Sequence, residues 1–123
     1  LYTVGYEAGR QAYIEHARIL PEPETRKLAA ALFQLLGYGR MEIVQLDETK
    51  REAVVRVYDS FECELFKGVG EIRGNFVRGL LAGWFAGHWQ LGSEEEEAFA
   101  KEVKCIARGD PYCEYSIRVE RKR

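Results

Sequence analysis

The stretch Asn75-Phe-Val-Arg-Gly-Leu-Leu-Ala-Gly-Trp-Phe-Ala-Gly-His-Trp-Gln90 is the most apolar segment of the chain, and its composition is that of a helix buried on nearly all sides. Three glycines, Gly79, Gly83 and Gly87, recur every four residues within it. Residues four apart lie above one another on a helix, so these glycines form a bare strip along one side. Such a strip lets a sheet or another helix approach closely, and we expect this helix to be central to the fold.

Two further helices are expected before this segment. From Leu1 to about Ile19, the apolar residues fall near one face, which we expect to be buried, and Gly5 and Gly9 lie four apart, which suggests close packing. The apolar residues of this face are Val4, Ala8, Ala12 and Ile14. Two prolines then interrupt the chain, and the pattern predicts a second helix over residues 24–36. Its apolar stripe consists of Leu28, Ala31, Leu32 and Leu35.

Two hairpins complete the pattern. The segments 41–46 and 52–60 are rich in β-branched residues and flank a polar turn. Residues 99–120 predict a second hairpin around Arg108-Gly-Asp-Pro111, and its return strand alternates between apolar and polar residues. Residues 61–73 are expected to form a short helix and a loop. The order of elements predicts an α+β fold in which an antiparallel sheet of about four strands packs against helices.

Length and charge exclude several classes of protein. A chain of 123 residues has the size of one domain, so we expect residues 1–123 to form a single unit. Its formal charge is −2 with both signs mixed, which predicts no direct nucleic-acid binding. The uncharged run Gly79–Ser93 is too short and too polar to span a membrane. Three cysteines without a secretory signal favour a reducing compartment, so we expect a cytoplasmic protein.

The sequence carries no familiar catalytic motif. It has no GxGxxG, P-loop, HExxH or GxSxG pattern, and no partner is evident for either histidine, His16 or His88. It also lacks a nicotinamide or flavin fingerprint, which a reductase would need as its source of hydride. A binding function is therefore favoured over an enzymatic one.

Cysteines flank the turn of the second hairpin. If Gly109 is the centre of that turn, Cys105 faces Cys113, and opposed β-carbons about 4.5–5.5 Å apart let two thiolates share a metal ion. Glu102 would point to the opposite face of a regular strand, so it joins the site only through a bulge or if the strand begins after it. Cys63 could supply a further thiolate. The alternative is that the cysteines pack as small apolar residues.

Aromatic residues are dense in the second half of the chain. Most of them are expected to form the core, and some to enclose an apolar pocket between the 75–90 helix and the sheet. One or two polar groups would then determine which ligand is selected, because apolar contacts distinguish similar ligands by only about 1–3 kcal/mol per methylene. The predicted ligand-binding residues are Phe61, Phe76, Leu80, Trp84 and Tyr115.

Four segments resemble the 4-vinyl-reductase-type domain, a small-molecule-binding module also described as hydrocarbon-binding. They are Gly5-Tyr-Glu-Ala-Gly9, Asp59-Ser-Phe-Glu-Cys63, Phe76-Val-Arg-Gly-Leu-Leu-Ala-Gly83 and Glu102-Val-Lys-Cys-Ile-Ala-Arg-Gly-Asp-Pro-Tyr-Cys113. Together they extend over nearly the whole chain. The E-x2-C-x7-C spacing of the last segment is similar to the metal-binding signature in the sensor domains of aromatic-responsive, NtrC-type transcription activators.

This resemblance implies a function as well as a fold. The fold would be similar to that of TRAPP-type trafficking subunits and NO-sensing domains, and the domain would be a homodimer. It would bind a small hydrophobic or phenolic ligand and hold a zinc ion through Glu102, Cys105 and Cys113. Relatives usually carry a further cysteine where this chain has Gly74, so Cys63 or His88 would supply the fourth ligand. The alternatives are a TRAPP-like interaction module and a reductase of a tetrapyrrole vinyl group.

Overall fold

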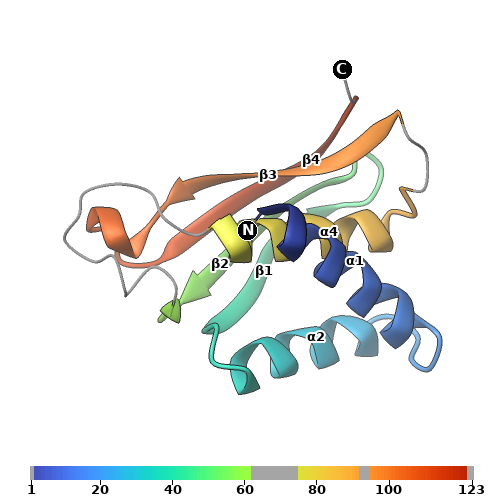
Figure 1. Cartoon of the computed structure of the whole chain (residues 1–123), viewed down its shortest axis with the longest axis horizontal. Coiled ribbons are helices and arrows are strands. Elements are labelled where there is room, and N and C mark those ends of the chain that lie inside the picture. The colour runs from blue at the N-terminus through green and yellow to red at the C-terminus, as the bar shows by residue number, and fades with distance from the viewer. Residues whose placement is uncertain (1, 62–74, 92–94, 122–123) are drawn as a thin grey trace.

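The computed structural model describes residues 2–61, 75–91 and 95–121 (Figure 1). Its elements are α1 (Tyr2–Ala17), α2 (Glu24–Leu35), β1 (Arg40–Asp47), β2 (Glu52–Tyr58), α4 (Asn75–His88), β3 (Glu96–Lys104), the short 3-10 helix η1 (Ile106–Arg108) and β4 (Cys113–Arg121). The predicted helices and hairpins are all present, and β3 begins three residues before the expected start. The short helix and loop expected over residues 61–73 lie almost entirely outside the described residues.

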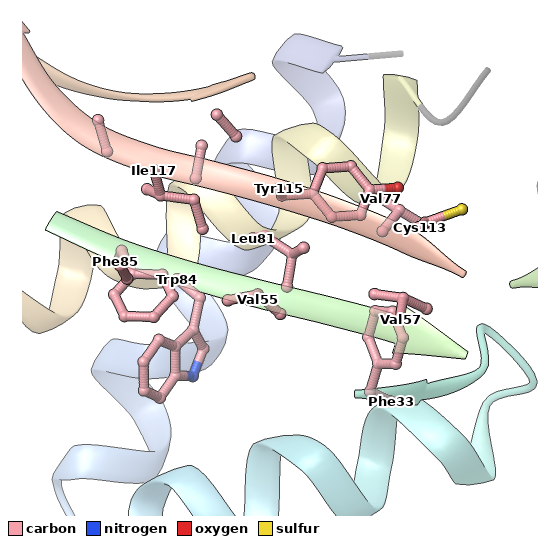
Figure 2. Packing of buried hydrophobic residues seen from close by; sticks show 14 of the residues in the cluster. Phe33, Val55, Val57, Val77, Leu81, Trp84, Phe85, Cys113, Tyr115 and Ile117 are labelled. Atoms are coloured by element: carbon pink, nitrogen blue, oxygen red, sulfur yellow. The ribbon is translucent and has the colours of Figure 1, made fainter. Parts of the chain in front are cut away.

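The strands form one antiparallel sheet in the order β1-β2-β4-β3. The three helices lie on one side of it (Figure 1). Alternate residues of β2 and β4 point toward these helices, and those in the middle of both strands are fully buried. Figure 2 shows Val55 and Tyr115 on this face, opposite Leu81 of α4. The predicted α+β architecture is therefore confirmed.

The two helices α1 and α4 run side by side in the same direction, and their glycines bring the two backbones into contact (Figure 1). A β-carbon at Gly79 would overlap the carbonyl oxygen of Tyr2, and one at Gly9 would overlap that of Leu80. Gly5 and Gly83 are enclosed in the same way. Both predicted glycine strips therefore serve the packing of α1 against α4 within one chain. They give no evidence for or against a dimer.

The predicted buried face of α1 was wrong. Val4 is 63% exposed and Ile14 is 37% exposed, whereas the buried residues of this helix are Gly5 and Gly9. The apolar pattern misleads here because α1 meets α4 through its backbone at glycines, not through large aliphatic side chains. The stripe predicted for α2 is wrong at Leu35, whose side chain is 80% exposed at the last residue of the helix.

Polar contacts fasten the edge strand β3 to the helices. The backbone N–H of Ala98 donates a hydrogen bond to the Tyr6 hydroxyl oxygen of α1 at 3.1 Å. Arg78 of α4 donates to the Ala100 carbonyl at 3.0 Å, and its guanidinium lies 4.3 Å from the centre of the Tyr2 ring. These contacts cover backbone groups that an edge strand would otherwise present to another chain. No helix among the described residues is long and apolar enough to cross a membrane.

Candidate functional site

A cavity of about 300 Å³ lies between α1, α2 and α4. Its wall is almost entirely apolar. The lining residues are Ala8, Gly9, Ala12 and His16 of α1, Ala29, Leu32 and Phe33 of α2, Leu36, Tyr38 and Met41 after it, and Phe76, Leu80, Leu81, Trp84 and Phe85 of α4. The lining part of α1 covers eight steps along the helix, or about 12 Å at 1.5 Å per residue. The cavity is therefore elongated along the helices.

Three of the five predicted ligand-binding residues line this cavity together, namely Phe76, Leu80 and Trp84. Tyr115 is fully buried on the sheet and Phe61 is 59% exposed, and neither lines the cavity. The cavity also lies among the helices and not between α4 and the sheet, as the sequence had suggested. The reason is that α4 packs directly on the sheet and fills that space, with side chains such as Phe85 fully buried (Figure 2).

Two buried polar atoms belong to residues of the cavity wall. Trp84 is only 6% exposed, and its Nε1 atom has no hydrogen-bond partner among the described residues. The same holds for Nδ1 of His16. In Figure 2 the Trp84 indole extends away from the sheet, toward the side where α2 lies. A buried donor without a partner costs about 1–3 kcal/mol, so a ligand that supplies the partner recovers this free energy.

His16 was not predicted as a wall residue, because a lone histidine on a helix is usually exposed or hydrogen-bonded. Its place follows from the position of α2, which packs beside the last turn of α1 after the chain reverses. The signal that could have found it is the spacing of Ala8, Ala12 and His16, which repeat every four residues and share one helix face.

The predicted metal ligands Glu102, Cys105 and Cys113 come together at one end of the sheet. All three residues are buried, and one ligand atom from each lies within 4.8 Å of the others. The register of β3 against β4 shifts between Glu102 and Lys104, which is the bulge that the sequence required for Glu102 to join the cysteines. The last pair of the ladder, Lys104 with Glu114, has the register that places Cys105 opposite Cys113, although Cys105 itself follows the end of β3.

The turn that carries the cysteines is held by its own hydrogen bonds. The N–H of Cys105 donates to Oδ2 of Asp110 at 2.8 Å, and the N–H of Ile106 donates to Sγ of Cys113 at 3.4 Å. Gly109 ends η1 with φ +109°, a conformation that favours glycine. The bond from Cys105 and the Arg108 guanidinium together lower the pKa of Asp110. The two cysteines therefore sit on a braced turn.

The donor set fits zinc. One carboxylate and two thiolates are ligands that zinc takes in tetrahedral sites, where ligand atoms about 2.0–2.3 Å from the metal lie roughly 3.5 Å apart. Since the three ligand atoms lie within 4.8 Å of one another, they would need to approach by about 1.3 Å at most. Cys63, the predicted further ligand, lies outside the described residues. His88, its alternative, is not part of this group and contacts Glu48 instead.

The chain is similar in fold to several proteins of known structure. No protein-family model matches the chain. The phenol-responsive sensory domain of the transcription activator PoxR, solved with phenol, superposes with a TM-score of 0.75 at 13% identity, over 95% of this chain and 61% of that one. A vinyl-4-reductase family protein from Methanocaldococcus jannaschii superposes with a TM-score of 0.67 at 18% identity, over 99% and 68%. The chain has the fold of these proteins.

Two further similarities agree with this assignment. Subunit 3 of a trafficking protein particle complex from Naegleria fowleri, covalently bound to palmitic acid, superposes with a TM-score of 0.58 at 15% identity, over 97% of this chain and 77% of that one. An uncharacterised protein of Methanocaldococcus jannaschii is 25% identical over 122 residues, which are 99% of this chain and 65% of that protein. The chain therefore spans slightly less than two thirds of this relative. The resemblance predicted from the sequence is confirmed for the fold.

Proposed function

We propose that residues 1–123 form a single domain that senses a small hydrophobic or phenolic molecule in the cavity between α1, α2 and α4. The observation that carries this proposal is Nε1 of Trp84, a buried hydrogen-bond donor without a partner among the described residues, in a wall whose other such atom is Nδ1 of His16. Ligand sites have this composition, with mostly apolar walls and few polar groups that orient the ligand. The phenol-responsive PoxR domain has the same fold, which supports a sensor function.

The chemistry of the wall favours a phenol over a plain hydrocarbon. A hydroxyl oxygen can accept a hydrogen bond from Nε1–H of Trp84, and its proton can be donated to Nδ1 of His16 when that nitrogen is unprotonated. Tyr13 of α1 contacts the Trp84 ring at 5.0 Å and lies one helical turn before His16, so both polar groups lie toward the same end of the cavity. The remaining length, lined by residues such as Leu36 and Phe76, suits an apolar substituent.

Zinc at Glu102, Cys105 and Cys113 is part of the proposal. A structural zinc ion would supply a cross-link between the end of β3, the turn and the start of β4, and its thiolate ligands require a reducing, cytoplasmic setting. These residues would hold the ion as one carboxylate and two thiolates, and Cys63 is proposed as a further ligand. Since Cys113 precedes Tyr115 on β4, the ion would stabilise the strand that α4 packs against.

We also propose that the domain is a homodimer that uses the outer face of α1. This face carries Val4 and Ile14 in exposed positions, opposite the glycines that contact α4.

The alternative function is a TRAPP-like interaction module, in which a lipid chain or a partner peptide would fill the cavity. The palmitic acid in the trafficking subunit of the same fold favours this second candidate. A reductase is not proposed, because the sequence has no fingerprint for a hydride-donating cofactor.

Calorimetric titration with two molecules of matched shape tests the sensor function. 4-Ethylphenol and 4-ethyltoluene differ only in a hydroxyl and a methyl group, and we expect the phenol to bind more tightly. Trp84→Phe keeps an aromatic ring but removes the N–H, which is expected to weaken 4-ethylphenol binding by about three- to tenfold. The affinity for 4-ethyltoluene should change much less. Absence of binding by both molecules would reject the sensor function and favour the interaction module.

A further inference from the structure

His88, the last residue of α4, lies in an aromatic enclosure beside the cavity. Its ring stacks on Trp84, with ring centres 5.5 Å apart and an angle of 14° between the planes. Tyr13 and Phe85 present their edges to it at 5.5 and 6.1 Å, and only 9% of its side chain is exposed. The orientation of the indole that faces the cavity therefore depends on this imidazole.

Both ring nitrogens of His88 meet oxygen atoms from segments that are distant in the sequence. Nε2 lies 2.9 and 3.1 Å from the two carboxylate oxygens of Glu48, in the turn between β1 and β2. Nδ1 lies 3.3 Å from the Tyr13 hydroxyl and 3.6 Å from Oε1 of Glu22, in the connection between α1 and α2. Glu48, Tyr13 and Glu22 are the titratable groups in contact with the ring in the described part of the chain.

The charge state of His88 changes its contacts at Nδ1. A carboxylate only accepts hydrogen bonds, so Nε2 carries a proton toward Glu48 whether the ring is neutral or charged. In the neutral ring Nδ1 accepts from the Tyr13 hydroxyl; burial, together with Glu22 and Glu48, raises the pKa of this phenol and keeps its proton in place. In the charged ring Nδ1 becomes a donor, and the Tyr13 oxygen and Glu22 are its acceptors.

Two other features of the structure lie where they would interact with a positive charge on the ring. The carbonyl end of a helix stabilises a cation, and His88 ends α4. The face of an indole also attracts a cation, and Trp84 provides one. Protonation therefore adds an ion pair with Glu22, which lies in the α1–α2 connection six residues after His16. Its other carboxylate oxygen pairs with Arg26 of α2 at 2.9 Å, so Glu22 would link α2 to the end of α4.

We propose that His88 is a proton-dependent positioning residue of the cavity. The charged ring holds Glu22, and with it the α1–α2 connection, against α4, so the end of the cavity near Trp84 and His16 is closed more firmly. The neutral ring loses this ion pair, and the ligand is released more readily. This inference rests on the proposed function, because it concerns the regulation of the same cavity.

Titration of the full chain with 4-ethylphenol at about pH 5.5 and about pH 8, on either side of the usual histidine range, tests this role. The wild-type protein should bind two- to fivefold more tightly at the lower pH, about the range that a partly exposed ion pair contributes. His88→Gln keeps an N–H group that can donate to Glu48 but carries no charge. It should bind 4-ethylphenol no more tightly at the lower pH than at the higher pH, because the remaining histidine, His16, accepts the hydroxyl proton only when its Nδ1 is unprotonated. Glu22→Gln should lose the difference as well.

His16→Gln removes the other of the two histidines in the chain. Because His16 lines the cavity, the affinity of this variant is compared only between the two pH values and not with the wild type. His16→Gln should still bind 4-ethylphenol more tightly at the lower pH. If this difference in affinity is lost in His16→Gln and persists in His88→Gln, the proposal is overturned. The indole ¹H–¹⁵N signal of Trp84 in the ligand-free protein gives a second readout. This signal should shift between the two pH values in the wild type and should not shift in His88→Gln. Because the measurement needs no ligand, it tests the role of His88 even if 4-ethylphenol does not bind. A pH-invariant signal in the wild type would also overturn it.

Discussion

Substitution of Gly83 by alanine tests the close packing of α1 on α4. The added β-carbon would overlap the Tyr6 carbonyl oxygen and lie 2.6 Å from the carbonyl carbon of the same residue. Carbon atoms pack at about 3.5–4.0 Å, so the helices would have to separate by roughly 1 Å. These are main-chain atoms that cannot rotate away. We expect a loss of about 1–3 kcal/mol from overpacking, against a gain of up to ~1 kcal/mol from helix propensity.

The free energy of unfolding, measured by urea denaturation followed by circular dichroism, gives the result. Gly83→Ala should be less stable than the wild type by about 1–2 kcal/mol. Gly87→Ala is the matched control, because its β-carbon would meet only side-chain atoms of Tyr13, at 2.9–3.1 Å, which is a smaller overlap than the one with the backbone at Gly83. Its loss should be clearly smaller. A neutral or stabilising effect of Gly83→Ala, as helix propensity alone predicts, would refute the reasoning.

The remaining predictions concern the metal and the oligomeric state. Protein purified under reducing conditions should carry about one zinc ion per chain by elemental analysis, and Cys105→Ser should lose the ion and melt at a lower temperature. Wild-type protein free of metal would contradict the zinc site. Sedimentation at tens of micromolar should give a dimer, and Val4→Glu should convert it to a monomer, because a charge would replace an apolar side chain at the proposed interface. A wild-type monomer would contradict the dimer.

The sheet and the metal group could be predicted because their signals are local. The alternation of apolar and polar residues in β4 fixes which side chains face the helices, and Cys113 and Ile117 are both buried as it requires. The spacing of Glu102 and Cys105 allowed Glu102 to join the cysteines through a bulge or a later start of the strand, and the register of β3 contains a bulge. In these segments a short-range pattern determines the direction of each side chain, so the sequence is sufficient.

The packing of α1 and the position of the cavity depend on long-range contacts. The exposed Val4 looked like a core residue because its spacing follows the helical period, but the contact that decides the orientation of α1 is made by Gly5. The cavity was expected between α4 and the sheet, whereas α2 closes it from the other side. The sequence of α2 does not determine where this helix packs, so the shared face of Ala8, Ala12 and His16 could be read from the spacing but not the cavity that it lines.

The most direct test of the central claim is the indole ¹H–¹⁵N spectrum of the protein during titration with 4-ethylphenol. The chain has two tryptophans, so the spectrum contains two indole signals, and Trp84→Phe assigns them. If the hydroxyl accepts a hydrogen bond from Nε1 of Trp84, the proton of that signal moves downfield toward a plateau at saturation, while the Trp89 signal moves much less. Binding that saturates by calorimetry with the Trp84 signal unmoved, or with Trp89 alone affected, would contradict the proposed site.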